Sequence, residues 1–332
     1  MPALVHTGWS YKGIDAVTLE NPRLRLDILT GLGAKIYNLI DLECGRNLLW
    51  HNHRVVPAPA PFGSNFDDHW AGGWDEPFPN GAQASFDGTV RPYLGELWAR
   101  PWQWEVLGDA DDVSVHLWCD AVITPARVEK WITLDPTKPI VRFHHRITNT
   151  GLEAFDFMFG IHPALAVRPG DRIDLPAAIV DVGESRDNRL GVVGRQYPWP
   201  MVSDASGREV DLRSIMDSSA ATYGLLYAHR LSKGWLAVSA HDGGPSLALA
   251  FPTDIFRSVW LWLVYGGWRG FHHVAVEPWT GHPASIDAAY RLGETSRLAA
   301  RESLQFDVTA TIYRGLRQVR DVTMEGEVVG IA

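Results

Sequence analysis

The spacing of turn signals is the feature that most restricts how this chain can fold. Gly, Pro, Asn and Asp clusters recur at intervals of roughly eight to fifteen residues, and few segments between them show the 3.6-residue periodicity of a helix. Short alternating stretches between frequent turns are typical of antiparallel sheets. The sequence therefore predicts an all-β protein with few and short helices.

Alternation of apolar and polar residues indicates where the strands lie. We expect an opening hairpin from 23–29 and 35–40, and a three-stranded meander from 128–134, 140–148 and 154–161. Further strands are expected at 225–227, 235–240, 246–251, 259–264 and 304–313. No stretch has the composition of an interdomain linker, so residues 1–332 are expected to form a single domain.

Two strand ends carry polar residues opposite an apolar face. In residues 155–163 (FDFMFGIHP) the expected strand ends in His162, on the face opposite Phe157 and Phe159. In residues 274–278 (VAVEP) Glu277 likewise faces away from the valines, and we expect Pro278 to end that strand. An imidazole and a carboxylate placed in this way can form a general acid and base pair. The alternative is that both are ordinary polar residues at strand ends.

The region between the hairpin and the meander is rich in glycine, proline and aromatic residues. It reads NFDDHWAGGWDEPFPN at 65–80 and YLGELWARPWQW at 93–104. This composition favours loops laid over the end of a sheet, where binding sites are often built. Among the 15 tryptophans of the chain, Trp74 and Trp98 lie here, and an indole face is well suited to stack on a sugar ring. The alternative is that these tryptophans only fill a wide core.

Charge and cysteine usage exclude several classes of function. The net charge is −9, and no run of Lys or Arg is present, which argues against nucleic acid or an anionic membrane as the partner. Cys44 and Cys119 make neither a disulfide framework nor a zinc motif. No leader-like N-terminal pattern or membrane-spanning apolar stretch is seen. We expect a cytoplasmic monomer or homodimer that acts on a small molecule.

Five short blocks together resemble one known family. They are GGWDEPFPNG, GELWARPW, FGIHPAL, PGDRIDLP and VEPWTGHP, and in this order they resemble the aldose 1-epimerase (galactose mutarotase-like) family over residues 24–313. The resemblance implies a single large antiparallel β supersandwich with a sugar site and no obligatory cofactor. It also implies an isomerase that interconverts the α and β anomers of a sugar by opening and closing the ring.

The resemblance also suggests roles for individual residues. His162 matches the acid that protonates the ring oxygen, and Glu277 the base that takes the proton of the anomeric hydroxyl. This assignment needs His162 to be partly protonated at rest, which a nearby carboxylate such as Asp156 could favour. The expected substrate-binding residues are Trp74, Asp75, Glu76, Asn80, Arg91, Trp98 and Trp279. For Asp75, Glu76 and Asn80 a capped turn is the alternative reading.

No metal site is expected, although His51 and His53, His144 and His145, and His272 and His273 lie close in sequence. Adjacent residues on a strand face opposite sides, and no Cys or carboxylate completes a recognisable set of ligands.

One position departs from the pattern of the family. Many relatives carry a histidine where this chain has Leu94. Either His162 suffices, or Tyr93 or His69 compensates, or the substrate is different. An anionic sugar (phosphorylated, sulfonated or acidic) is one alternative, and a carbohydrate-binding protein without catalysis is another. An anionic substrate would need an arginine at the site, and the candidates are Arg91, Arg100, Arg142 and Arg146.

Overall fold

The computed structural model describes residues 3–108 and 113–331. The chain divides into two compact units, and each unit combines two separate stretches of sequence. Unit 1 consists of Met1–His162 and Thr280–Val308, and unit 2 consists of Pro163–Trp279 and Thr309–Ala332. The sheets of both units are antiparallel, as the turn spacing predicts.

The first sheet of unit 1 begins at the N-terminus. Its neighbouring strands are β1 (Leu4–Tyr11), β2 (Ile14–Glu20), β3 (Leu24–Leu29), β4 (Lys35–Asp41) and β6 (Trp74–Asp75), and β5 (Arg46–Asn47) also pairs with β4. The expected opening hairpin is β3 and β4, in which Leu26 lies opposite Leu39. This expectation is confirmed, but β1 and β2 precede the hairpin and were not predicted.

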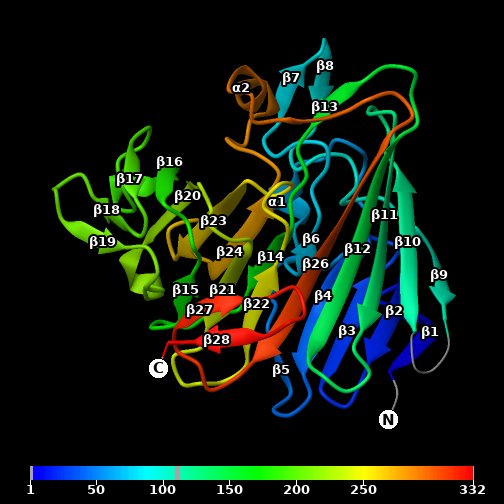
Figure 1. The fold of residues 1–332 in the computed structure, drawn as a ribbon, viewed down its shortest axis with the longest axis horizontal. Helices are drawn as coiled ribbons and strands as arrows, with labels where there is room; N and C mark the ends of the chain where they lie inside the picture. The colour runs from blue at the N-terminus through cyan, green and yellow to red at the C-terminus, as the bar shows by residue number, and fades with distance from the viewer. Residues whose placement is uncertain (1–2, 109–112, 332) are drawn as a thin grey trace. The chain divides into compact units, whose positions relative to one another are not determined.

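The second sheet of unit 1 contains long strands that Figure 1 shows in green and teal. It consists of β9 (Gln103–Leu107), β10 (Ser114–Asp120), β11 (Ala126–Leu134), β12 (Ile140–Asn149) and the first part of β26 (Ser303–Tyr313). Val128 and Ile132 of β11 are buried on one face, as their two-residue spacing predicts. Lys130 lies between them on the same face and is also buried. The first two strands of the predicted meander are confirmed.

The prediction that residues 154–161 form the third strand of the meander is wrong. β13 covers only Phe155–Phe157 and pairs with β25 (Ser296–Leu298). After it the chain leaves the ladder because its N–H groups bond to a distant loop. The Met158 N–H donates to Pro79 O at 2.7 Å and the Gly160 N–H to Pro77 O at 3.1 Å. His162 therefore begins a strand, β14 (His162–Leu165), instead of ending one.

Unit 2 contains the later strands that the sequence predicts. One run consists of β14 from Pro163 onwards, β24 (His272–Trp279), β23 (Ser258–Tyr265), β20 (Thr222–His229), β16 (Ile179–Ser185) and β17 (Gln196–Pro198). A second run consists of β15 (Arg172–Asp174), β21 (Trp235–Ser239), β22 (Ser246–Ala250) and the last part of β26. β24 continues past Pro278, because Val259 still pairs with Pro278 and Ser258 with Trp279. The prediction that Pro278 ends the strand is wrong.

The remaining elements are short. The α-helices of the described residues are α1 (Phe66–His69) and α2 (Ile286–Arg291). The 3₁₀ turns of the described residues are Arg186–Asn188 and Ser218–Ala220. The prediction of few and short helices is therefore confirmed. Neither α-helix has the length or apolarity needed to cross a membrane. Three small hairpins complete the chain: β7 (Ala84–Phe86) with β8 (Thr89–Arg91), β18 (Met201–Ser203) with β19 (Glu209–Asp211), and β27 (Val319–Val322) with β28 (Val328–Gly330).

Asn21 joins the two sheets of unit 1 at one end. Its Oδ1 accepts the N–H groups of Arg23 and Leu24 at 2.8 and 2.7 Å, which closes the turn between β2 and β3. Its Nδ2 donates to the carbonyls of Asp135 and Lys138 at 2.6 and 2.9 Å, in the turn between β11 and β12. One buried amide therefore satisfies backbone groups of both turns.

We expect Asn21→Ala to lower the free energy of unfolding by about 2–4 kcal/mol, because buried backbone groups lose their partners. Urea denaturation monitored by circular dichroism would measure this change. The matched control is Asn65→Ala, which removes an exposed side chain that caps α1 and should cost about 1 kcal/mol or less. Equal losses in the two variants would contradict this role of Asn21.

Candidate functional site

His162 lies in unit 1 among aromatic side chains. Its ring meets those of Trp70 and Phe66 edge to face, with centroids 5.4 and 6.0 Å apart. Phe66 in turn contacts Trp98 at 5.2 Å, also edge to face. His162 is only 5% exposed. The imidazole therefore lies at a buried aromatic cluster formed by α1 and the segment around Trp98.

Burial determines the protonation of His162. Burial has the largest effect on the pKa of the imidazole and lowers it, because the charged form is disfavoured away from water. The carboxylate of Asp75 raises this pKa, and the ammonium of Lys35 lowers it. The net result is a pKa lowered to about 4. The imidazole of the resting protein is therefore neutral near pH 7, and the expectation of a partly protonated His162 is not met. Asp156 is engaged elsewhere, with Thr295 at 3.0 Å and Arg297 at 2.5 Å.

Asp75 and Glu76 are adjacent in sequence but bind different lysines. Lys35 Nζ lies 2.7 Å from Asp75 Oδ2 and also donates to Gly72 O at 2.9 Å. Lys130 Nζ lies 3.0 Å from Glu76 Oε2 and donates to Ala34 O at 2.9 Å. Both ion pairs are almost completely buried. Successive residues of an extended chain point to opposite sides, which explains why the two carboxylates diverge.

Glu76 has a second partner in β12. His145 Nε2 lies 3.1 Å from Glu76 Oε1, and both side chains are buried. Burial alone would raise the pKa of Glu76, but the charges of Lys130 and His145 and their hydrogen bonds outweigh it and lower the pKa to about 2. The neighbour of His145, His144, turns instead to Asp307, with 2.7 Å between Nδ1 and Oδ1. These two adjacent histidines therefore share no ligand position.

Asn80 and Arg91 belong to a network of loop contacts. Asn80 Nδ2 donates to the carbonyls of Ala82 and Pro92 at 2.9 and 2.8 Å, while its Oδ1 is buried without a hydrogen-bond partner among the described residues. Arg91 Nη1 donates to Thr124 Oγ1 at 2.5 Å and to Glu96 Oε1 at 3.3 Å. Asn80 therefore holds the loop together and still has one free acceptor, whereas the guanidinium of Arg91 already has a carboxylate.

Trp74 and Leu94 are both buried in this region. Trp74 packs against Phe143 of β12 with ring centroids 5.2 Å apart, so it contributes to the core of unit 1. Leu94 has φ +54°, a conformation that L-residues rarely adopt. The next residue, Gly95, packs so closely on the Phe78 carbonyl that a Cβ would lie 2.0 Å from the oxygen. The segment from Leu94 to Trp98 is thus fitted tightly over the loop that contains Asn80.

Glu277 and Trp279 lie in unit 2, on the same face of β24. Trp279 Nε1 donates to Glu277 Oε2 at 2.8 Å, and the indole of Trp279 stacks on that of Trp260 with centroids 3.8 Å apart. Burial raises the pKa of Glu277 to about 8, against the smaller opposing effect of the Trp279 hydrogen bond. Glu277 is therefore largely protonated near pH 7, on a face with a flat aromatic surface beside it.

Each unit thus provides a buried group that can exchange a proton. The pKa of His162 is lowered and that of Glu277 is raised, so both groups are mainly uncharged at neutral pH. Strongly perturbed pKa values of this kind are common among catalytic acids and bases. Aromatic rings accompany both groups: Phe66 and Trp70 in unit 1, and the Trp260–Trp279 stack in unit 2.

Solved structures similar to this chain have a common architecture. A protein of Klebsiella pneumoniae, provisionally named an aldose 1-epimerase, superimposes with a TM-score of 0.71 at 12% identity, over 94% of this chain and 83% of its own. A galactose mutarotase-like protein of Clostridium acetobutylicum gives 0.66 at 10% identity, over 95% and 99% of the two chains. A similar protein of Lactobacillus casei gives 0.60 at 16% identity, over 90% and 100%.

The chain has the galactose mutarotase-like fold. It is a large antiparallel supersandwich, as the sequence motifs imply, and the resemblance is confirmed at the level of the fold. No protein-family model matches the sequence. No curated protein matches it either.

Sequence reasoning missed several polar residues of this chain. Lys35, Lys130 and His145 hold the buried carboxylates, yet none was a candidate. A signal was present for two of them. Lys130 shares its strand face with Val128 and Ile132, and His145 shares its face with Phe143, so each places a polar group on an apolar face. Such a position indicates a buried partner elsewhere in the chain.

The lowered pKa of Glu76 predicts a pH-dependent contribution to stability. Because the folded-state pKa of about 2 lies below the ordinary value of 4.5, the ionised carboxylate stabilises the fold above about pH 4.5, and this contribution is lost as the pH falls towards 2. At pH 7 we expect Glu76→Gln to cost on the order of 3 kcal/mol. Urea titrations at several pH values should show this cost shrinking below pH 4.5.

The matched control for Glu76→Gln is Glu105→Gln. Glu105 is exposed and pairs with His116 at 3.0 Å. An exposed pair contributes at most about 1 kcal/mol, so this variant should differ little from wild type at any pH. A cost of Glu76→Gln that does not change between pH 7 and pH 3 would show that the charge of Glu76 is not what stabilises the fold.

Proposed function

We propose that this protein is an isomerase that interconverts the α and β anomers of a sugar by acid–base opening of the ring. His162 and Glu277 are the proposed pair that exchanges protons with the ring oxygen and the anomeric hydroxyl. We further propose that residues 1–332 act as a single domain. In support of this, the similar structures cover at least nine-tenths of this chain.

The strand register is the observation that carries the proposal. In the pairing of β14 with β24, Ala164 lies opposite Ala275 and Leu165 opposite Val274. All four of these paired residues belong to unit 2. In sequence, His162 comes two residues before Ala164 and Glu277 two residues after Ala275. The ladder therefore joins the two segments of the chain that lead to the proposed groups, although these groups are distant in sequence.

The chemistry of ring opening fits a pair that holds one proton in total. One group gives a proton to an oxygen of the hemiacetal while the other accepts one, and ring closure after rotation about the C1–C2 bond reverses the transfers. The free protein near pH 7 has this single proton on Glu277 rather than on His162. The proton can act from either group, because both arrangements contain one acid and one base.

The first test is removal of the carboxyl group. We expect Glu277→Gln to lower kcat by about 100-fold or more, because an amide can neither give nor take the proton. NMR exchange spectroscopy on a panel of neutral and anionic sugars would measure the rate between anomers after subtraction of the uncatalysed rate. The control is Glu184→Gln, which changes an exposed carboxylate of unit 2 and should leave kcat unchanged. Turnover near wild type in Glu277→Gln would remove Glu277 from the mechanism.

The second test is His162→Asn. We expect a similar loss of kcat with a thermal midpoint within a few degrees of wild type, because an amide retains hydrogen bonds but cannot take up a proton. If the variant unfolds, the histidine is structural. If sugars bind to wild type without any faster exchange, the protein is a carbohydrate-binding protein.

The pH profile provides a third test. Because the pair holds one proton between the pKa of about 4 for His162 and that of about 8 for Glu277, kcat/KM should be level between these values and fall on either side. An acidic limb near 6.5, the ordinary pKa of histidine, would contradict the buried environment of His162. The control His144→Gln changes a more exposed histidine and should leave both limbs in place.

A further inference from the structure

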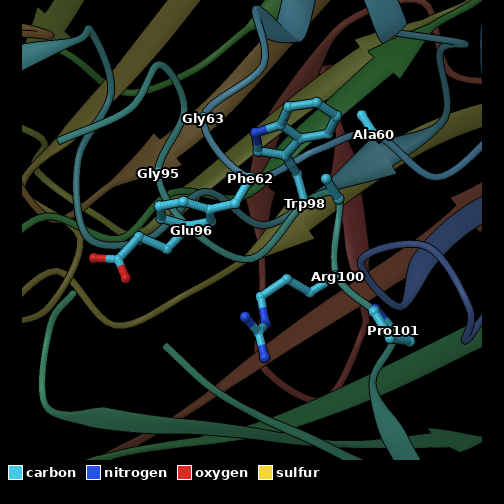
Figure 2. A pocket seen from close by; sticks show the side chains of 9 residues that line it. Ala60, Phe62, Gly63, Gly95, Glu96, Trp98, Arg100 and Pro101 are labelled. Carbon is cyan, nitrogen blue, oxygen red and sulfur yellow. The ribbon is translucent and has the colours of Figure 1, made fainter. Parts of the chain in front are cut away.

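A pocket of about 260 Å³ opens in unit 1 beside Trp98. Figure 2 shows the side chains that line it, with the indole of Trp98 and the ring of Phe62 on one side and the guanidinium of Arg100 on another. The complete lining is Ala60, Phe62, Gly63, Gly95, Glu96, Trp98, Ala99, Arg100 and Pro101. A volume of this size is of the order of a single sugar ring with a substituent.

Arg100 brings a positive charge to this pocket without a carboxylate partner in the described residues. Asp120 interacts with it electrostatically, but both oxygens of Asp120 are already held by Arg127 at 2.8 and 3.0 Å. The side chain of Arg100 bonds instead to the thiol of Cys119, which is a weak acceptor. Its Nε is buried and has no hydrogen-bond partner within residues 3–108 and 113–331. Most half-buried guanidinium groups have a stronger acceptor than this one.

Glu96 also lines the pocket but does not neutralise Arg100. Its carboxylate accepts the N–H groups of Val122 and Ile123 at 2.7 and 2.6 Å and the hydroxyl of Thr124 at 2.7 Å. It also pairs with Arg91 at 3.3 Å. In Figure 2 its oxygens point away from Trp98 and Arg100. The pocket therefore keeps the positive character of Arg100.

The aromatic residues supply the apolar part of the pocket. Phe62 is 46% exposed, so its ring is accessible to a molecule that enters the pocket. Trp98 lies behind it and contacts Phe66 at 5.2 Å, and Phe66 contacts His162 at 6.0 Å. One phenylalanine ring therefore separates the wall of the pocket from the imidazole of the proposed mechanism.

We propose that this pocket binds the anionic group of an acidic saccharide. Arg100 would pair with the carboxylate, sulfate or phosphate, and the rings of Phe62 and Trp98 would pack on the apolar face of the attached sugar. The assignment deepens the proposed function, on which it rests, by making the substrate an anionic sugar rather than a neutral hexose. Arg91 is a weaker candidate for this role than Arg100, because its guanidinium already pairs with Glu96.

Isothermal titration calorimetry tests this assignment on the full-length protein. Glucuronate and glucose 6-phosphate represent the two sources of the anionic group, glucose represents the neutral sugar, and inorganic phosphate represents the anion alone. We expect at least one of the two anionic sugars to bind tenfold or more tightly than glucose and than inorganic phosphate. The preference for glucuronate or for glucose 6-phosphate distinguishes a carboxylate site from a phosphate site.

Variants identify the residue that is responsible. Arg100→Met should weaken binding of the preferred anionic sugar by tenfold or more and leave glucose binding unchanged, and Arg100→Lys should recover part of the loss. Phe62→Ala should weaken the anionic sugar but not inorganic phosphate. The control Arg23→Met removes an exposed arginine that pairs with Glu43 at 3.2 Å and should have no effect. Thermal midpoints of all variants confirm that they are folded.

Two results would overturn the assignment: equal affinity of wild type for glucose and both anionic sugars, or unchanged affinity in folded Arg100→Met. Inorganic phosphate that binds as tightly as glucose 6-phosphate would overturn the role of the sugar ring. The Glu277→Gln variant separates this proposal from the proposed function, because it should bind the anionic sugar normally while losing turnover. If Glu277→Gln remains active while Arg100→Met loses binding, the mechanism fails and the anion subsite stands.

Discussion

The buried carboxylate of Glu76 holds together the part of unit 1 on which the rest of the candidate site depends. A charge removed from water costs several kcal/mol unless partners compensate it, so Glu76 is fixed where Lys130 and His145 can reach it. These partners lie in β11 and β12, while Glu76 directly follows β6. The same constraint therefore ties the glycine- and aromatic-rich loops to the long strands of the second sheet. Asp75, the preceding residue, is fixed in the same way by Lys35.

This arrangement explains the electrostatics around His162. The carboxylate of Asp75 would favour a charged imidazole, but Lys35 opposes it, so the pair presents little net charge and burial prevails. Burial prevails at Glu277 as well, with the opposite chemical result. Removal from water favours the uncharged form of each group, which takes the proton from an imidazole and keeps it on a carboxyl. A polar substrate that replaces some of the missing solvation would change this balance at the moment of binding.

The sequence was sufficient where structure depends on local pattern. Val128, Ile132 and Phe143 alternate with polar residues, and the strands that contain them lie where the alternation predicts. It was insufficient where backbone groups bond to distant loops. Phe159 and its neighbours alternate like a strand, yet Met158 and Gly160 bond to Pro79 and Pro77, and no local pattern reveals that pairing.

The candidate site shows the same division between local and distant information. His162 and Glu277 could be selected from their motifs, and both are buried beside aromatic rings. The lysines that compensate Asp75 and Glu76 could not be assigned, because the partner of a buried charge is chosen by tertiary structure. Protonation states were inaccessible for the same reason, since they depend on how completely each group is shielded from water.

The division of the chain has a consequence for how the protein is made. The boundaries between the units fall after His162, after Trp279 and after Val308, so neither unit is a continuous piece of sequence. Unit 1 lacks one of its segments until residue 308 has been synthesised, and unit 2 lacks β27 and β28 until residue 330 has been synthesised. Neither unit can therefore be completed before its later segment is made, and a nascent chain must keep its unpaired strands from aggregating until then.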